Sequence, residues 1–400
     1  MLISTNEPVV NEQNPATVRT EFPADFQRCT LTVMDNIADP DIRFDEQGVC
    51  NYYHDYHKAV QDFLLPEPQR TQALERFLSR IKEEGKNKPY DCLIGVSGGV
   101  DSTYVAWLTK EWGLRPLAVH LDNGWDSELA VKNIENIIKG LGIDLFTLVV
   151  NWEEFRDIQL AYLKASVVDI EVVSDHAIFS TMYRLAKEHK IPYVLSGTNI
   201  VTEYIMPPGW LYSKMDYANL KHIHDTYGRL KRRTYPSYNF YKHIFYNAVL
   251  RLNPISILNY IDYDKAKAKA TITNQLGWRD YGGKHYESNF TKFYQAYILP
   301  EKFKIDKRKA HYSTLICSGQ MTRQQALAEL EKPIYPVDEL KADKEYVLKK
   351  LGLSDDEFES IMNQPVRKHS EFRSDKKWKS LYNTLLERTA TFRKFFKKAS

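Results

Sequence analysis

An apolar segment at 91–96 runs directly into the glycine-rich loop Ser-Gly-Gly-Val-Asp-Ser, and a helical pattern begins at once behind it. This order predicts a strand, a tight loop and a helix whose first N–H groups and dipole face the loop, a ready-made anion site. Gly98 and Gly99 permit torsions and a close approach that a Cβ would block. We predict that the loop binds a nucleotide through Ser97, Gly98, Gly99, Val100, Asp101 and Ser102.

The residue types in this loop indicate how a phosphate would be held. The Ser97 and Ser102 hydroxyls can donate to phosphate oxygens, and Asp101 can hold a Mg²⁺ ion that bridges them. The spacing matches neither G-x-x-x-x-G-K-[ST] nor G-x-G-x-x-G, which excludes Walker-type and Rossmann dinucleotide loops. It resembles the PP-loop of the N-type ATP pyrophosphatases, a superfamily that includes GMP synthetase, asparagine synthetase and tRNA-modifying ligases. The resemblance implies that ATP is cleaved between its α and β phosphates and that the loop holds the pyrophosphate.

Apolar strands alternate with helical patterns from residue 91 to about residue 198. We expect four strands, at 93–97, 114–122, 145–150 and 192–198. Such alternation predicts an α/β fold with a parallel sheet and helices on both faces, here of the PP-loop (HUP-like) kind. Ligands of these sheets bind beyond the carboxyl ends of the strands.

Composition and pattern divide the chain into five parts. We expect a flexible tail at 1–24, a small cysteine-bearing segment at 25–66, a helix and linker at 67–90, a PP-loop ATP pyrophosphatase domain at 91–215 and, at 216–400, a mainly helical C-terminal region with an active-site lid. A basic amphipathic helix is expected near 376–398.

Charge and cysteine usage exclude several classes of protein. The net charge is only +3, from 55 basic and 52 acidic side chains, so the chain as a whole lacks a polyanion-binding signature. No apolar run reaches the length of a membrane span, and the polar N-terminus lacks a signal sequence. Four widely spaced cysteines do not indicate a disulfide framework. We expect a cytoplasmic protein with no membrane partner and no nucleic-acid partner.

Polar residues follow the second and fourth expected strands. His120, Asp122 and Asn123 end the second strand and are candidate nucleotide ligands. Gly197 and Thr198 end the fourth, where small residues let a ligand approach the backbone, and the candidate substrate-binding residue Glu203 follows. Taken alone, these segments are ordinary turn chemistry. Beside the glycine-rich loop, they favour a nucleotide site.

A second set of candidate residues lies far downstream. Two glycines at 282–283 precede Lys284 and His285, and this pair predicts a mobile lid that carries donors over the polyphosphate. Cations there would offset the charge that develops on the pyrophosphate, as Mg²⁺ also would. The alternative is a solvated basic loop. We assign catalysis to Asp101, Lys284, Arg308 and His311, and substrate binding to Glu203, His285 and Glu287.

A closer resemblance extends over about residues 28–330. The segments HLDNGWDSELAVKNI, LSGTNIVTE and GGKHYESNFTKFYQAYILPEKFKIDKRKAHYSTLICSGQ are similar to the WbpG-like N-acetyl sugar amidotransferase family. The resemblance implies an ATP-dependent conversion of a sugar acetamido group to an acetamidino group, in the biosynthesis of bacterial surface polysaccharide such as the O-antigen of lipopolysaccharide. It implies a diacetamido sugar acid, nucleotide-linked or free, as the substrate.

The N-terminal segment departs from the family pattern. Family members have two C-x-x-C pairs, a spacing typical of a structural zinc site. The corresponding positions here are Cys29, Thr32, Cys50 and Tyr53, so that two thiols remain. Thr and Tyr are poor zinc ligands. His54 and His57 could complete a zinc site if the loop rearranged, but the spacing Cys50-x-x-x-His54 is not the usual one, so we expect a metal-free segment held by packing.

The source of nitrogen is expected to be another chain. Position 2 is Leu, which excludes an N-terminal-nucleophile glutaminase, and about 90 residues before the sheet are too few for a triad glutaminase domain. Cys92 lies in a core strand, and Cys317 lacks an evident base. The family resemblance implies two partners, a glutaminase subunit and a cyclase-like barrel subunit, which supply ammonia.

Two other functions stay open. The tract 231–242 mixes cations with aromatic residues, as surfaces that bind single-stranded nucleic acid do, which would suit a tRNA-modifying ligase or thiolase. The same tract could bind an anionic nucleotide sugar or pack a helix. The other alternative is a non-catalytic scaffold that binds ATP without cleaving it.

Overall fold

The core of the protein is a five-stranded sheet in which every pair of neighbouring strands is parallel. The computed structural model describes residues 23–248, 252–283, 286–382 and 384. The strand order is β3-β2-β1-β4-β5. The strands are β1 (Cys92–Gly95), β2 (Pro116–Asp122), β3 (Asp144–Val149), β4 (Tyr193–Ser196) and β5 (Asn253–Ser256). The predicted α/β class with a parallel sheet is confirmed.

Helices cover both faces of this sheet and form most of the remaining chain. They are α1 (Asn51–Phe63), α2 (Gln69–Gly85), α3 (Val100–Glu111), α4 (Glu128–Leu141), α5 (Trp152–Ala165), α6 (Val172–Glu188), α7 (Ile200–Glu203), α8 (Tyr217–Tyr227), α9 (Phe240–Ala248), α10 (Lys265–Leu276), α11 (Asn289–Phe293), α12 (Leu299–Phe303), α13 (Lys307–Cys317), α14 (Arg323–Glu331), α15 (Val337–Leu351) and α16 (Asp355–Met362). The expected terminal helix begins at 376, and most of it lies outside the described residues. None of the described helices is long and apolar enough to cross a bilayer.

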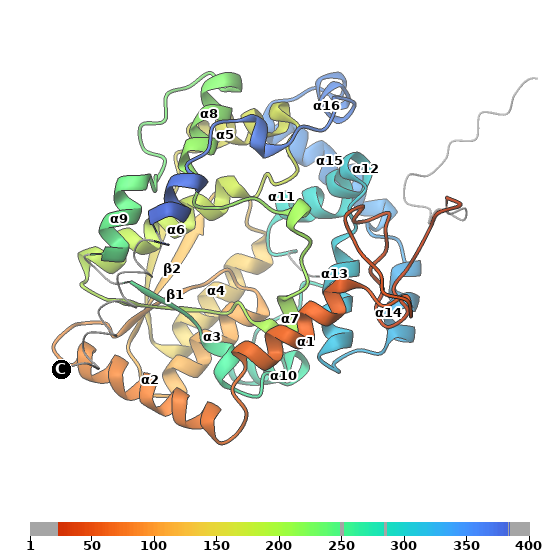
Figure 1. Cartoon of the computed structure of the whole chain (residues 1–400). Coiled ribbons are helices and arrows are strands. Elements are labelled where there is room, and N and C mark those ends of the chain that lie inside the picture. The colour runs from red at the N-terminus through yellow and green to blue at the C-terminus, as the bar shows by residue number, and fades with distance from the viewer. Residues whose placement is uncertain (1–22, 249–251, 284–285, 383, 385–400) are drawn as a thin grey trace, which may run out of the picture.

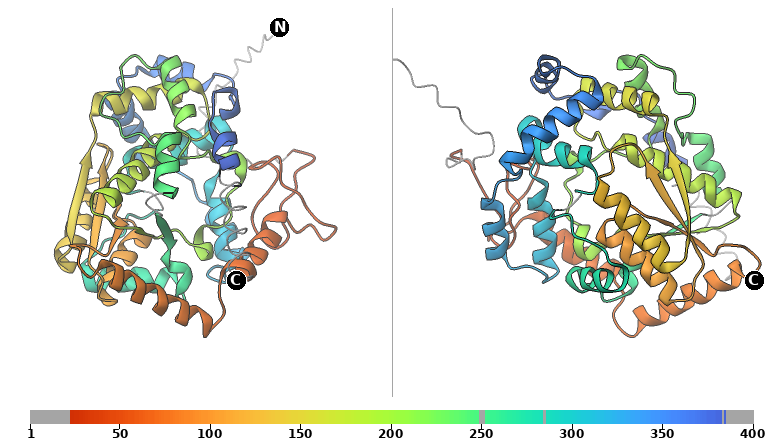
Figure 2. Two further views of the ribbon diagram at one scale, coloured as in Figure 1. Left: turned by 60° about the vertical axis from the view of Figure 1, so that its left-hand side comes forward. Right: turned by 180° about the vertical axis from the view of Figure 1, so that it is seen from behind.

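Successive residues of the central strands point to opposite faces, and each face has its own core. Ile94 belongs to a core with Val105 of α3 and with residues of α4 and α10. The neighbouring Leu93 belongs to another core, with Leu185 of α6. Figures 1 and 2 show the C-terminal helices α13, α14 and α15 to one side of the sheet, with the N-terminal coil against them. The glycine-rich loop therefore lies at the carboxyl edge of a sheet that is covered on both faces.

The sheet has one strand more than the four expected, although the described part of the region beyond residue 215 is mainly helical, as predicted. β5 lies beyond residue 215 and pairs in parallel with β4, from Tyr193 opposite Asn253 to Ser196 opposite Ser256. Its four residues, Asn-Pro-Ile-Ser, are too short to show a strand pattern, and Pro254 argues against a central strand. An edge strand tolerates proline because one side of it needs no ladder hydrogen bonds. The sheet thus takes a strand from the C-terminal region.

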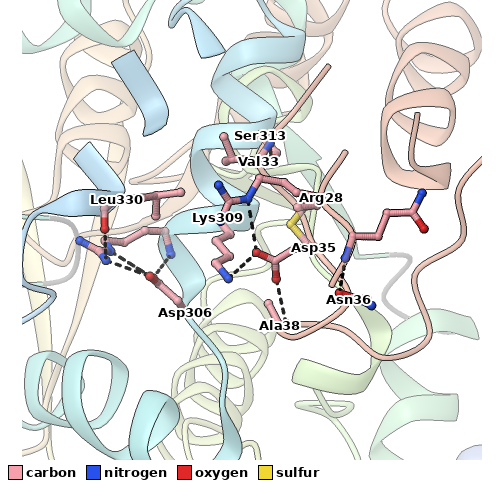
Figure 3. Close-up of polar contacts among 12 residues, drawn as sticks. Arg28, Val33, Asp35, Asn36, Ala38, Asp306, Lys309, Ser313 and Leu330 are labelled. Atoms are coloured by element: carbon pink, nitrogen blue, oxygen red, sulfur yellow. Dashed lines mark hydrogen bonds and ion pairs between the residues drawn. The ribbon is translucent and has the colours of Figure 1, made fainter. Parts of the chain in front are cut away.

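The N-terminal coil is fixed to α13 by a buried ion pair, as Figure 3 shows. The Asp35 carboxylate is fully buried and accepts from Lys309 Nζ at 2.6 Å, with Arg28 Nε 3.6 Å away. Val33 N donates to Ser313 Oγ at 3.2 Å beside it. A buried carboxylate needs such partners because its desolvation is costly. These contacts position α13, which in turn reaches the strand ends.

Candidate active site

The glycine-rich loop is shaped at Gly98, whose φ of +81° favours glycine. Its carbonyl accepts from Trp278 Nε1 at 2.7 Å and from the Tyr281 hydroxyl at 3.0 Å. A Cβ at this position would lie 2.6 Å from the Tyr281 hydroxyl. The two aromatic side chains therefore fix the backbone of the loop from outside the 91–215 segment.

Hydrogen bonds within the loop prepare the start of α3. Ser97 Oγ and Ser102 Oγ lie 3.1 Å apart, and Ser97 Oγ accepts from Gly99 N at 3.3 Å. Gly99 is the N-cap, and its carbonyl accepts from Thr103 N at 3.0 Å, the first bond of the helix. The N–H groups of a helix's first turn have no partners within that helix and point out of its end. Two hydroxyls and a helix N-terminus thus converge as predicted.

Asp101 is held in the first turn of α3 by a residue that the sequence did not single out. Its Oδ1 accepts a hydrogen bond from the Tyr263 hydroxyl. Burial, together with the Asp101 and Glu203 carboxylates, raises the pKa of Tyr263 well above its usual range, so the phenol remains a donor. On the other side, a Cβ on Gly197 would lie 3.0 Å from the carbonyl carbon of Asp101. The ends of β1 and β4 therefore meet at Asp101.

A second carboxylate faces the loop from the C-terminal region. Glu287 Oε1 lies 3.5 Å from the position that a Cβ on Gly99 would occupy, and the Glu287 carbonyl accepts from Ser127 N at 2.9 Å. Carboxylate oxygens beside a phosphate-binding loop repel phosphate unless a cation lies between them, and oxygen donors are what Mg²⁺ prefers. Asp101 and Glu287 each place carboxylate oxygens beside the loop. The described residues contain no group of three or more His, Cys, Asp or Glu arranged to hold a metal by themselves.

The predicted lid residues Lys284 and His285 lie outside the described residues. Their neighbours do not: Tyr281 donates to Gly98, and Glu287 faces Gly99. Both ends of the short segment between them therefore lie at the loop. The roles assigned to Lys284 and His285 stay predictions.

His120, Asp122 and Asn123 organise the edge of the sheet. The His120 ring joins Val96 O at 3.0 Å to Asp126 Oδ2 at 3.0 Å. Asp122 Oδ1 accepts from Gly124 N at 2.9 Å, and Asn123 Oδ1 accepts from the N–H of residue 125 at 3.1 Å. These hydrogen bonds shape the turn that follows β2 and join it to the end of β1. Nucleotide contacts by these three side chains stay predictions.

A row of hydroxyls at the ends of β4 and β5 includes one predicted residue and two that were missed. Thr198 Oγ1 lies 3.0 Å from Ser196 Oγ and 2.9 Å from Ser256 Oγ. The hydrogen bonds between them lie in a part-exposed setting at the carboxyl edge of the sheet. Ser256 could not be assigned from the sequence because β5 itself was not recognised.

Arg308 and His311 both lie on α13, but they have different surroundings. Arg308 binds Asp306 Oδ2 at 2.9 Å and donates to backbone carbonyls at the end of α14, among them Lys332 O at 2.9 Å. These bonds connect α13 to α14, and the catalytic role assigned to Arg308 stays a prediction. His311 Nδ1 lies 3.2 Å from Thr202 O in α7, next to Glu203. The structure therefore brings His311 to the segment that follows β4, and its assigned role stays a prediction.

Both cysteines of the N-terminal segment are buried and lie next to each other. Cys29 Sγ accepts from Cys50 N at 3.2 Å and from Thr32 N at 3.3 Å. The hydrogen bond from the Cys50 side chain outweighs burial and lowers the pKa of Cys29 to about 5. Thr32 Oγ1 lies 3.6 Å from Cys50 Sγ, in the place where the family pattern has a third cysteine. Backbone N–H and hydroxyl groups therefore surround the sulfur atoms.

Comparison with known proteins finds a family model that matches the C-terminal part of the chain. The family model described as LPS biosynthesis protein WbpG-like, C-terminal domain, matches residues 287–385. An uncharacterized protein of Methanocaldococcus jannaschii is 25% identical over 273 residues, which are 66% of this chain and 79% of that protein. The glutamine-hydrolyzing GMP synthase of Pyrobaculum aerophilum is 38% identical over 87 residues, which are 22% of this chain and only 16% of the synthase.

Two solved structures also align with this chain. The NH3-dependent NAD synthetase of Campylobacter jejuni is 18% identical with a TM-score of 0.28, over 51% of this chain and 83% of the synthetase. The NMN synthetase of Francisella tularensis is 15% identical with a TM-score of 0.29, over 53% of this chain and 87% of that enzyme.

Substitution of Gly98 tests the geometry of the loop. Gly98→Ala should destabilise the fold by about 1 kcal/mol for its positive φ and should also abolish ATP binding, because the Cβ meets Tyr281. Gly142→Ala is the matched control: its φ is +56°, and a Cβ there would meet nothing within 4 Å. Urea unfolding and ATP titration of both variants separate the two effects. Normal ATP affinity in Gly98→Ala would contradict the assigned role.

The hydrogen bonds of His120 to Val96 and Asp126 should make the stability of the fold depend on pH. Burial opposes the charge on His120, but the hydrogen bond and charge of Asp126 outweigh it and raise the pKa above its usual 6.5. A raised folded-state pKa stabilises the fold below the unfolded value, and that contribution is lost as the pH rises through the folded value. His120→Gln should therefore cost more free energy of unfolding at about pH 5.5 than at about pH 8.5. An equal cost at both pH values would contradict this. So would an unchanged difference between the two costs when His120→Gln is measured in the Asp126→Asn background.

Proposed function

The chain carries a WbpG-like C-terminal domain, and on this premise we propose that it is an ATP-dependent amidotransferase that converts a sugar acetamido group to an acetamidino group. One observation carries the proposal: Glu287, the first residue of the matched domain, faces Gly99 of the ATP loop. This contact supports a single site shared by the domain that bears the family likeness and the glycine-rich loop. The proposed substrate is a diacetamido sugar acid, nucleotide-linked or free, of lipopolysaccharide O-antigen biosynthesis.

The reaction requires activation of a poorly reactive amide. In the proposed first step, the acetamido oxygen attacks the α-phosphorus of ATP, the α–β bond breaks, and pyrophosphate leaves. Ammonia then adds to the imidoyl carbon, the C–O bond to the AMP group breaks, and the amidine forms with release of AMP and a proton. No protein nucleophile is needed, so catalysis consists of positioning and of stabilising the charge on pyrophosphate.

The loop residues can meet these demands. The first N–H groups of α3 and the Ser97 and Ser102 hydroxyls would hold the pyrophosphate as its charge develops. A Mg²⁺ ion bound by Asp101 and Glu287 would neutralise part of that charge. Tyr263 fixes the Asp101 carboxylate, and Trp278 and Tyr281 fix the loop backbone, so these groups need little rearrangement during the reaction.

We propose that the ammonia comes from a partner glutaminase through a cyclase-like barrel subunit. A thiol must ionise to attack glutamine. Burial raises the pKa of Cys92 far above its usual range and that of Cys317 to about 12, with a smaller contribution from Cys29 to the latter. Neither environment favours a nucleophilic thiolate, and Cys29, whose pKa is lowered, is fully buried and closed to glutamine. Because the matching GMP synthase is described as glutamine-hydrolyzing, glutamine is the proposed primary nitrogen source.

Replacement of Asp101 tests the proposed chemistry. Asp101→Asn should lower the formation of AMP and pyrophosphate from ATP, an acetamido sugar acid and ammonium by about 10²-fold or more, because a charged ligand at the phosphates is lost. Asp62→Asn, an exposed carboxylate on α1 paired with Lys58, is the control and should keep full activity. Chromatography of the nucleotide products measures both variants. Near-normal turnover in Asp101→Asn, or formation of ADP by the unaltered chain, would overturn the proposal.

A further inference from the structure

A cavity with cations on its lining lies away from the ATP loop. It has a volume of about 710 Å³ and is lined by residues of β3, α6 and α9 and by the connecting segment 234–237. Figure 1 shows α6 and α9 beside each other at the side of the sheet. α6 packs on the face of the sheet opposite to α3, which follows the ATP loop. The cavity is therefore separate from the site described above.

Cations gather around this cavity. Arg184, Lys187 and Lys242 line it, and Glu188 is the single carboxylate among the lining residues. Desolvation and the nearby charges of Arg184 and Lys187 lower the pKa of Lys242. Three cations against one carboxylate leave an excess of positive charge, and this excess favours an anion.

Each cation has a contact that leaves donors available. The Arg184 guanidinium lies 5.6 Å from the Phe146 ring centre, and its Nη1 donates to Glu188 at 3.3 Å. Lys187 Nζ lies 5.0 Å from the ring centre of Phe245. Lys242 Nζ donates to Ser237 O at 2.7 Å. An ammonium has three donors and a guanidinium has five, so each retains capacity for a ligand.

The wall formed by segment 234–237 is built in advance. The Glu154 carboxylate accepts from Thr234 N at 2.9 Å and from Tyr235 N at 3.0 Å. The Tyr235 hydroxyl donates to Val173 O at 2.7 Å, which ties the segment to α6. These bonds use buried partners on α5 and α6. A preformed wall lowers the ordering cost of binding.

An unsatisfied hydroxyl lies in the same cavity. Ser180 of α6 lines the cavity and is only 6% exposed, and its Oγ has no hydrogen-bond partner among the described residues. Buried polar groups are nearly always paired, and an exception calls for an explanation. The Oγ is closed to solvent in this conformation, so a ligand oxygen would satisfy it once the Ser180 side chain rotates toward the cavity. This observation is independent of the cations and points to the same occupant.

We propose that this cavity binds a phosphorylated small molecule, with the phosphate at Arg184, Lys187 and Lys242 and an oxygen of the ligand at Ser180. Its volume is within the range of small-molecule sites and suits a sugar phosphate or a nucleotide. Tyr235, Tyr246 and Leu148 give it an apolar wall for the rest of the ligand. The cations surround a cavity and do not form a stripe along the surface, which favours a small ligand over a nucleic acid strand.

Calorimetry at low salt tests the proposal with the ATP loop filled by α,β-methylene-ATP. The probes are inorganic phosphate, UDP-N-acetylglucosamine and a twelve-nucleotide oligouridylate. We expect UDP-N-acetylglucosamine to bind at one further site. Arg184→Gln with Lys242→Gln should weaken this binding by about tenfold or more, since two charge-assisted contacts are lost. Inorganic phosphate should compete with UDP-N-acetylglucosamine, because the phosphate groups of the ligand make the main contacts.

Two further variants keep the test sharp. Ser180→Ala removes a hydroxyl that has no protein partner, so it should leave the fold intact and weaken binding about three- to tenfold. Lys132→Gln with Lys139→Gln on the exposed side of α4 is the charge-matched control and should change nothing. Absence of a second site, insensitivity to the cavity variants, or binding of oligouridylate alone would overturn the proposal. Because no step requires ATP cleavage, failure of the proposed reaction would leave this result standing.

Discussion

The geometry of the site depends on the carbonyl of Gly98. A phosphate-binding loop works only if its backbone N–H groups face one point, and the positive φ of Gly98 sets that direction. Trp278 and Tyr281 both donate to this one carbonyl. Buried aromatic donors seek a partner, so the interaction satisfies both sides at once. The loop is therefore completed by residues about 180 positions away along the chain.

These long-range hydrogen bonds make the C-terminal region part of the same structural unit as the loop. It supplies β5 to the sheet, Tyr263 to Asp101 and Glu287 to the face of Gly99. The two carboxylates near the loop would oppose phosphate in the absence of a cation, which ties nucleotide binding to Mg²⁺ in the proposed reaction. The N-terminal coil contributes more remotely, since Asp35 fixes α13 and α13 brings His311 to α7.

The local parts of this architecture could be predicted from the sequence, because strand, loop and helix follow one another within residues 91–112. The parallel sheet and the strand–loop–helix order around Gly98 were predicted on this basis. Tyr263 was missed, because its contact spans 162 residues and nothing in its own segment marks it. Trp278 and Tyr281 lie just before the glycine pair at 282–283. This position next to the predicted lid was the one sequence signal for their contact with the loop. For Arg308, the sequence indicated a charge but not the partners, which are Asp306 and the backbone at the end of α14.

The central claim is that the loop promotes transfer of AMP to the amide oxygen of an acetamido sugar. The most direct measurement uses a substrate whose acetamido carbonyl carries ¹⁸O, with ATP, Mg²⁺ and ammonium, and mass spectrometry of the nucleotide product. The account predicts one ¹⁸O atom in AMP for every amidine formed, because the C–O bond breaks and the P–O bond remains. Unlabelled AMP, or ADP in its place, would contradict it.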